Sequence, residues 1–258
     1  MRAIMCSAAL LLSGCSPPPD APQELEQLTT WLFGKVRDGT DEELEVGVNN
    51  LANWLDGRFD EASEGYTVDS LSEKTADAAD GRNGDLSDLV GASVATSLPF
   101  SLDRVEQAMM LKDQMDVFEG EYEKYDRTFE GQPRCFTNRE CLDIQARTQS
   151  TNKYPLGLSI DVDFSSEWRW VKADAGWTVV YRTWLRAPAD VSADWLGVNY
   201  QYFVGVNMPH KGKVRRLQTT WIAADLGDSP APETQALNMV VDAMAGTDDT
   251  LTDYLNGD

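Results

Sequence analysis

The stretch LGLSIDVDF, residues 156–164, is the clearest indication of the fold class, because apolar and polar residues alternate along it without a break. Successive side chains of an extended chain point to opposite faces. The apolar residues therefore share one face, and they are Leu158, Ile160, Val162 and Phe164. A period of two indicates a β-strand with one packed face and one polar face. Such strands are typical of an antiparallel sheet.

Two hairpins are predicted downstream of this strand. The stretch EWRWVKADAGWTVVYRTWLR, residues 167–186, contains two strand patterns that meet at a turn near 174–176. The stretch from Val198 to Leu226 contains two more, with a turn near 209–212. No long helical pattern separates these strands, so we expect them to pair in antiparallel fashion.

Helical patterns lie on both sides of the strand region. Residues 22–38 and 40–57 carry leucines at helical spacing and predict a helical hairpin, with Thr40 and Glu43 as a capping box. Near the middle of the chain we expect a strand around 89–98, a short helix capped by Ser101 and a strand over 121–129. A final helix is expected after Pro232.

This order of elements resembles the helix-grip fold of the START-like superfamily. The resemblance implies an α+β fold in which a curved antiparallel sheet wraps a C-terminal helix around an apolar cavity. The expected division of the chain is a signal peptide (1–14), a tether (15–22), a helical hairpin (23–57), a polar loop (58–88) and the α+β main domain (89–258).

Aromatic residues on the predicted strands raise the question of a ligand pocket. If their faces converge under the final helix, they line either a solid core or a hollow. Tyrosine and tryptophan are common in ligand pockets because they combine an apolar ring with a polar tip. The candidates for such a pocket are Tyr181, Tyr202, Thr219 and Trp221.

The N-terminus predicts export and lipid attachment. Arg2 and an apolar run precede Leu12-Ser13-Gly14-Cys15, which resembles the lipobox of bacterial lipoproteins. The resemblance implies diacylglycerol and palmitate on Cys15, with the cell envelope as location, and Ser16 favours the outer membrane. Four prolines between Ser16 and Pro22 favour a stiff, extended tether.

Composition limits the partners and the cofactors. The net charge of −21 argues against nucleic acid as a partner, since nucleic-acid binding relies on Lys and Arg. Without the signal peptide and the lipidated cysteine, Cys135 and Cys141 remain, and two thiols of an exported protein are expected to form a disulfide. The single His210 leaves no set of metal ligands, and we expect neither a metal nor another cofactor.

The sequence favours binding over catalysis. His210 lies at a predicted hairpin tip, which is a poor place for a catalytic base. Asp161 and Asp163 share a strand face at a spacing that glycosidases use, but serines flank them and the opposite face is apolar, so we interpret them as solvated. No glycine-rich phosphate loop is present.

Two functions remain open. The first is an envelope lipoprotein that binds an apolar ligand between the sheet and the final helix. The second is a structural lipoprotein with a solid core, which docks an envelope partner through the helical hairpin or the basic segment 211–216. The basic side chains of that segment are otherwise expected to face solvent and protect a sheet edge.

Overall fold

The computed structural model describes residues 19–153, 157–193, 195–225 and 233–257, with side chains from 241 onward in the last range. The predicted signal peptide and Cys15 lie outside these ranges. Within them, no helix has the length and apolar character that are needed to cross a bilayer.

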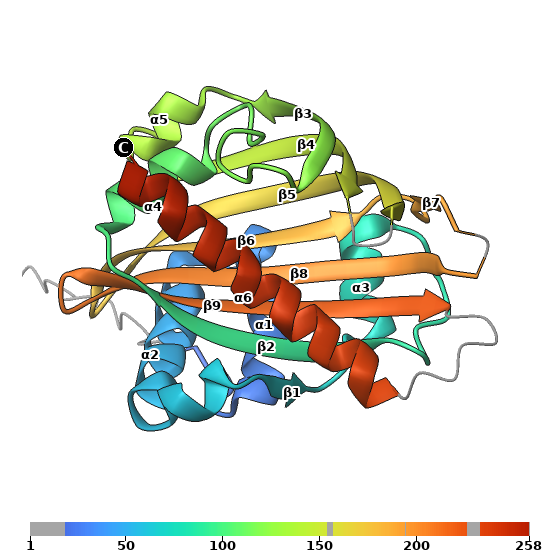
Figure 1. Ribbon diagram of the computed structural model, residues 1–258. Helices are drawn as coiled ribbons and strands as arrows, with labels where there is room; N and C mark the ends of the chain where they lie inside the picture. The colour runs from blue at the N-terminus through green and yellow to red at the C-terminus, as the bar shows by residue number, and fades with distance from the viewer. Residues whose placement is uncertain (1–18, 154–156, 194, 226–232, 258) are drawn as a thin grey trace, which may run out of the picture.

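A single curved antiparallel sheet forms the centre of the molecule (Figure 1). Its strands lie in the order β1-β2-β9-β8-β6-β5-β4-β3, and β7 pairs with β5 beside this path. The two end strands do not pair with each other, so the sheet is not closed into a barrel. The strand bounds are β1 Tyr66–Val68, β2 Val90–Leu98, β3 Tyr122–Glu130, β4 Asp143–Lys153, β5 Ser159–Ala173, β6 Gly176–Leu185, β7 Asp190–Val191, β8 Gly197–His210 and β9 Lys213–Asp225.

Both predicted hairpins are confirmed. The β5–β6 turn closes with Ala173 opposite Gly176, whose φ of +117° is accessible mainly to glycine. The β8–β9 turn consists of Lys211 and Gly212, with φ values of +51° and +79°. Two positive φ values in a two-residue loop match the twist of the flanking strands.

Helices cover both faces of the sheet. Figure 1 shows α6 (Glu233–Gly257) in front of the sheet, and α1 (Leu25–Asp38), α2 (Asp41–Ser63) and α3 (Glu73–Asp80) behind it. The short helices α4 (Leu102–Met109) and α5 (Pro133–Thr137) lie near the C-terminal end of α6. The strand order together with the C-terminal helix is the helix-grip arrangement, and the predicted α+β fold is confirmed.

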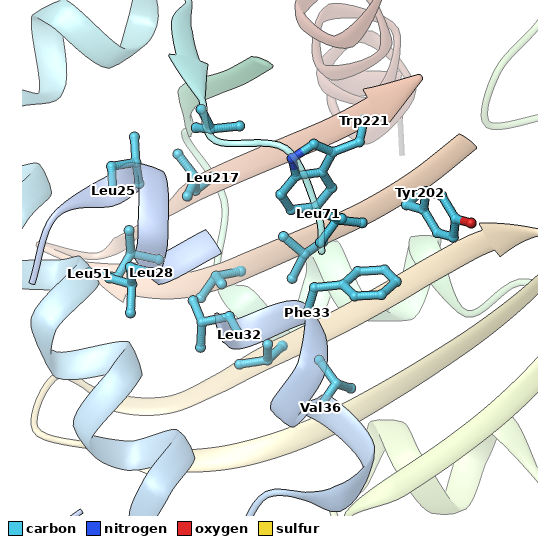
Figure 2. Packing of buried hydrophobic residues seen from close by; sticks show 14 of the residues in the cluster. Leu25, Leu28, Leu32, Phe33, Val36, Leu51, Leu71, Tyr202, Leu217 and Trp221 are labelled. Carbon is cyan, nitrogen blue, oxygen red and sulfur yellow. The ribbon is translucent and has the colours of Figure 1, made fainter. Parts of the chain in front are cut away.

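The N-terminal helices belong to the main core. The predicted capping box is present: the Thr40 hydroxyl accepts from the Glu43 amide at 3.1 Å, and Glu43 accepts from the Thr40 amide at 2.8 Å. Figure 2 shows Leu25 and Leu28 of α1 beside Leu51 of α2, and Phe33 of α1 next to Tyr202 and Trp221 from the sheet. Leu44 and Leu51 are fully buried. Docking of a partner through this apolar stripe is therefore wrong, because the sheet already covers it.

A buried ion pair joins this helical layer to the sheet. Arg182 of β6 donates to Glu167 of β5 at 2.7 Å, and the two side chains are 2% and 7% exposed. The same guanidinium donates to the carbonyl of Phe33 in α1 at 3.2 Å. A buried charge is tolerated where a partner and hydrogen bonds compensate its desolvation, so these contacts fix α1 against the sheet.

Two segments differ from the sequence-based expectation. The range 58–88, expected to be a polar loop, contains the end of α2, strand β1 and helix α3. Ser72 caps α3, because its hydroxyl accepts from the Thr75 amide at 3.2 Å. Strand β4 was not predicted, because its buried face contains only Ile144, Ala146 and hydroxyl side chains and lacks a strong apolar alternation.

Candidate ligand-binding face

The strand register separates the four predicted pocket residues. Residues paired across neighbouring strands share a face, and Tyr202 pairs with both Trp184 and Trp221. Tyr202 and Trp221, with Thr219 two residues before Trp221, therefore face α1–α3. Tyr181 pairs with Gly205 and Trp168 and faces α6. The four side chains do not line one cavity.

The three residues on the α1–α3 face belong to a packed core. Trp221 donates from its ring nitrogen to the Asp69 carbonyl at 2.8 Å, and Thr219 and Ser93 share a hydrogen bond of 2.6 Å. Each of these side chains is fully buried. For this face the structure shows the solid-core alternative.

Tyr202 also borders a surface hollow of about 590 Å³ beside α3. Its hydroxyl donates to the Asp80 carboxylate at 2.6 Å. Asp77 and Asp85 also line the hollow, so its wall is acidic. Such a wall does not suit an apolar ligand.

The α6 side of the sheet carries an incompletely covered apolar area. Phe164 of β5 and Phe203 of β8 meet edge to face, with ring centroids 6.1 Å apart. Both are only half-buried, as are Thr183 and Ile222 beside them. Figure 1 shows that α6 crosses the sheet diagonally from β1 and β2 toward α4, and that among the described elements no helix covers the end of β6 and the start of β8 on this side of the sheet. We call the area of Phe164, Thr183, Phe203 and Ile222 the open face.

Tyr181 marks one end of the open face. A Cβ atom built on Gly205 would lie 2.0 Å from Cζ of Tyr181, so the phenol ring lies directly across the backbone of β8. The Tyr181 hydroxyl accepts from Nη2 of Arg216 on β9 at 2.9 Å. The side chain thus reaches from β6 across β8 to a residue of β9.

A buried polar cluster lies on the far side of Tyr181. Arg216 donates to Asp248 of α6, and Asn207 of β8 donates to Glu106 of α4 at 2.6 Å. Gln218 donates to the same Asp248 carboxylate at 3.0 Å. We call Glu106, Asn207, Arg216 and Asp248 the polar cluster; each is at most 3% exposed.

The polar cluster contains charged and polar groups whose burial is unfavourable. Burial raises the pKa of the Glu106 carboxyl to about 7, although the hydrogen bond from Asn207 opposes the shift. One atom each of Glu106, Asn207 and Arg216 (Oε2, Oδ1 and Nε) is buried without a hydrogen-bond partner in the described part of the chain. Such atoms are costly, so the cluster holds α4, α6 and the sheet together at an energetic penalty.

The basic segment 211–216 does not form a solvated edge. Its strand β9 lies inside the sheet, between β2 and β8. Arg215 pairs with Asp56 of α2 at 2.6 Å, and Arg216 is part of the polar cluster. The predicted edge protection is therefore wrong, and only Lys211 and Lys213 are exposed at the turn.

The remaining predicted site residues lie outside this region. His210 closes the β8–β9 turn and contacts Arg215, with ring and guanidinium nitrogens 3.0 Å apart. Burial and the nearby cations Arg215 and Lys211 lower its pKa. No group of three potential metal ligands occurs in the described ranges.

Cys135 of α5 and Cys141 are free thiols that contact each other. Burial and the neighbouring Cys135 thiol raise the pKa of Cys141 to about 11. Their disulfide stays a prediction, as does lipid attachment at Cys15.

Sequence reasoning missed the residues that form the polar cluster. Glu106 lies between Val105 and Ala108, both on the buried side of α4, and Asp248 lies one helical turn after the buried Met244 of α6. A carboxylate within an apolar helical stripe is the signal that points to such a cluster. Asn207 and Arg216 carry no comparable signal, because only the register brings them together.

Comparisons with known proteins gave similarity to solved structures alone. No protein-family profile and no curated protein matches the chain. Among solved structures, it is similar to the STAR-related lipid transfer protein (fragment 25-204) from Xanthomonas axonopodis, at 14% identity and a TM-score of 0.43, over 67% of this chain and 96% of that chain. It is also similar to Ara h 8.0201, at 11% identity and a TM-score of 0.41, over 66% of this chain and 99% of that one.

Proposed function

We propose that this chain is a non-catalytic binding protein that holds a small apolar molecule on the open face beside α6. The observation that carries the proposal is the incomplete burial of Phe164 and Phe203, whose strands lie well inside the sheet. Full burial of one phenylalanine side chain contributes roughly 1.5–3 kcal/mol. A ligand that covers both rings gains a share of this free energy.

The surroundings of the open face favour an apolar occupant. Thr183 already donates to Ser166 at 2.8 Å, so it offers little to a polar ligand. Two buried charges on the same side of the sheet, Arg216 and Asp248, bind each other beyond Tyr181. Contact area rather than charge would therefore supply the affinity.

Binding of N-phenyl-1-naphthylamine, an uncharged probe that fluoresces in apolar surroundings, tests this proposal. The substitution Phe203→Ala should weaken binding about tenfold, because it removes one of the two rings. Phe59→Ala on α2 is the matched control: Phe59 is also half-buried but lies on the opposite side of the sheet, against Arg215. Absence of probe binding, or equal losses in both variants, would contradict the proposal.

We further propose that acyl chains on Cys15 anchor the protein to the cell envelope, at the outer membrane. The lipobox resemblance and the proline-rich stretch after it support this proposal. Two or more acyl chains hold a protein stably, whereas one holds it marginally. Radioactive palmitate should label the unaltered protein and the Cys6→Ser control, but not Cys15→Ser. Equal labelling of all three, or of none, would exclude the anchor.

A further inference from the structure

We infer that Tyr181 ends the ligand-binding face and so limits the length of the apolar chain that the protein can hold. This inference rests on the proposed function and deepens it. The inference implies that the ligand is an uncharged molecule whose apolar part, linear or compact, is short enough to end at Tyr181. Tyr181 has this limiting role because its side chain lies on the α6 side of the sheet and reaches from β6 across β8 to β9.

The register gives the length of the face. On β6, Leu185 lies at one end of the open face and Tyr181 at the other. Four residues of strand, at about 3.3 Å each, span about 13 Å. Phe203 and Thr183 pair with each other between these two ends.

Tyr181 is held in place from two sides. Its hydroxyl is bonded to Arg216, and its ring lies in the space that Gly205 leaves free. Gly205 does not have a positive φ, so the backbone does not require glycine there. The requirement is for space, because a Cβ atom at Gly205 would overlap the ring. Tyr181 is buried, with 9% of the residue exposed.

Beyond Tyr181 on this face, β8 and β9 carry polar residues, whereas β6 continues with the buried Val179. One residue pair beyond the ring, Asn207 lies opposite Arg216 in the polar cluster. An apolar chain that extended past Tyr181 would separate these buried polar groups from their partners. Leaving such groups unpaired is unfavourable, so methylene groups added beyond the ring should contribute no affinity.

A homologous series of straight-chain 1-alkanols, displacing bound N-phenyl-1-naphthylamine, tests this inference. In the unaltered protein each added methylene should tighten binding about fourfold until the chain reaches Tyr181, after which affinity should stop rising. In Tyr181→Ala the plateau should move to longer alkanols. In Tyr181→Phe it should stay, because the ring is retained.

Tyr202→Ala is the matched control, since it removes the same side chain from the opposite face of the sheet. Its plateau should equal that of the unaltered protein. If the alanine variant does not fold, Tyr181→Leu replaces it, because leucine keeps an apolar side chain that is too short to cross Gly205. In this variant too, the plateau should move to longer alkanols.

The possible results separate the inference from the proposed function. A plateau at the same chain length in Tyr181→Ala, or in Tyr181→Leu, overturns the inference while the binding function stands. The same holds if affinity rises without a plateau in the unaltered protein, or if Tyr202→Ala shifts the plateau. If neither the probe nor any alkanol binds, the proposed function fails and the inference with it.

Discussion

Replacement of Glu106 by glutamine should make the protein more stable at neutral and alkaline pH. The Glu106 side chain is 1% exposed, and burial raises its pKa from 4.5 to about 7. Between these two pH values the folded state binds more protons than the unfolded state. The free energy of unfolding therefore falls as the pH rises through this window.

The size of this effect follows from the shift. The difference of about 2.5 pKa units between 4.5 and 7 corresponds to about 3 kcal/mol at roughly 1.4 kcal/mol per unit. Glu106→Gln keeps an oxygen that can accept from Asn207 but cannot ionise. The variant should match the unaltered protein near pH 4.5 and exceed its stability by up to about 3 kcal/mol above pH 7.

Urea unfolding at a series of pH values, analysed as the difference between variant and unaltered protein, measures this effect. The difference cancels the titration of the other carboxyls. Glu123→Gln, which removes one acidic group from an exposed position, controls for net charge. A difference that does not change with pH, or a variant that is less stable at pH 8, would refute the reasoning and show that the carboxylate is well solvated.

Three further predictions concern the helical layer and the cysteines. Arg182→Met should lower the free energy of unfolding by up to about 3–5 kcal/mol, measured by urea denaturation, because the buried Glu167 loses its partner at 2.7 Å and keeps Arg37 at 3.6 Å. Leu51→Asp should abolish the cooperative thermal unfolding of the whole domain rather than the binding of a partner, since this leucine is fully buried against the sheet. For the protein isolated from an oxidising compartment, intact mass should show a disulfide between Cys135 and Cys141, and retention of both free thiols would contradict it.

The fold was largely predictable because its strongest elements carry local signals. Alternation in β5 and the turn glycines Gly176 and Gly212 placed the hairpins, and Ser101 marked the start of α4. Helix α3 was missed because its eight residues are polar or alanine, and only Ala76 among them is buried. Local pattern therefore failed where tertiary contacts alone stabilise an element.

The candidate site was less predictable because it depends on register. Tyr181 and Tyr202 lie in similar apolar strands, yet pairing places them on opposite faces of the sheet. A shift of one residue in the pairing would exchange these faces. Neither strand contains a local signal for its register, because both faces of the sheet are packed by helices and the residues alternate less strictly than in β5.

The helical layer behind the sheet explains how the open face can exist. A sheet needs at least one well-covered face to be stable. Here α1 and α2 bury leucines against the strands from one side, with Tyr202 and Trp221 beneath them (Figure 2). Because this side supplies a large core, the side facing α6 can leave Phe164 and Phe203 partly uncovered. Stability and binding thus depend on opposite faces of the same strands, so Phe203→Ala should weaken binding while the helical layer keeps the domain folded.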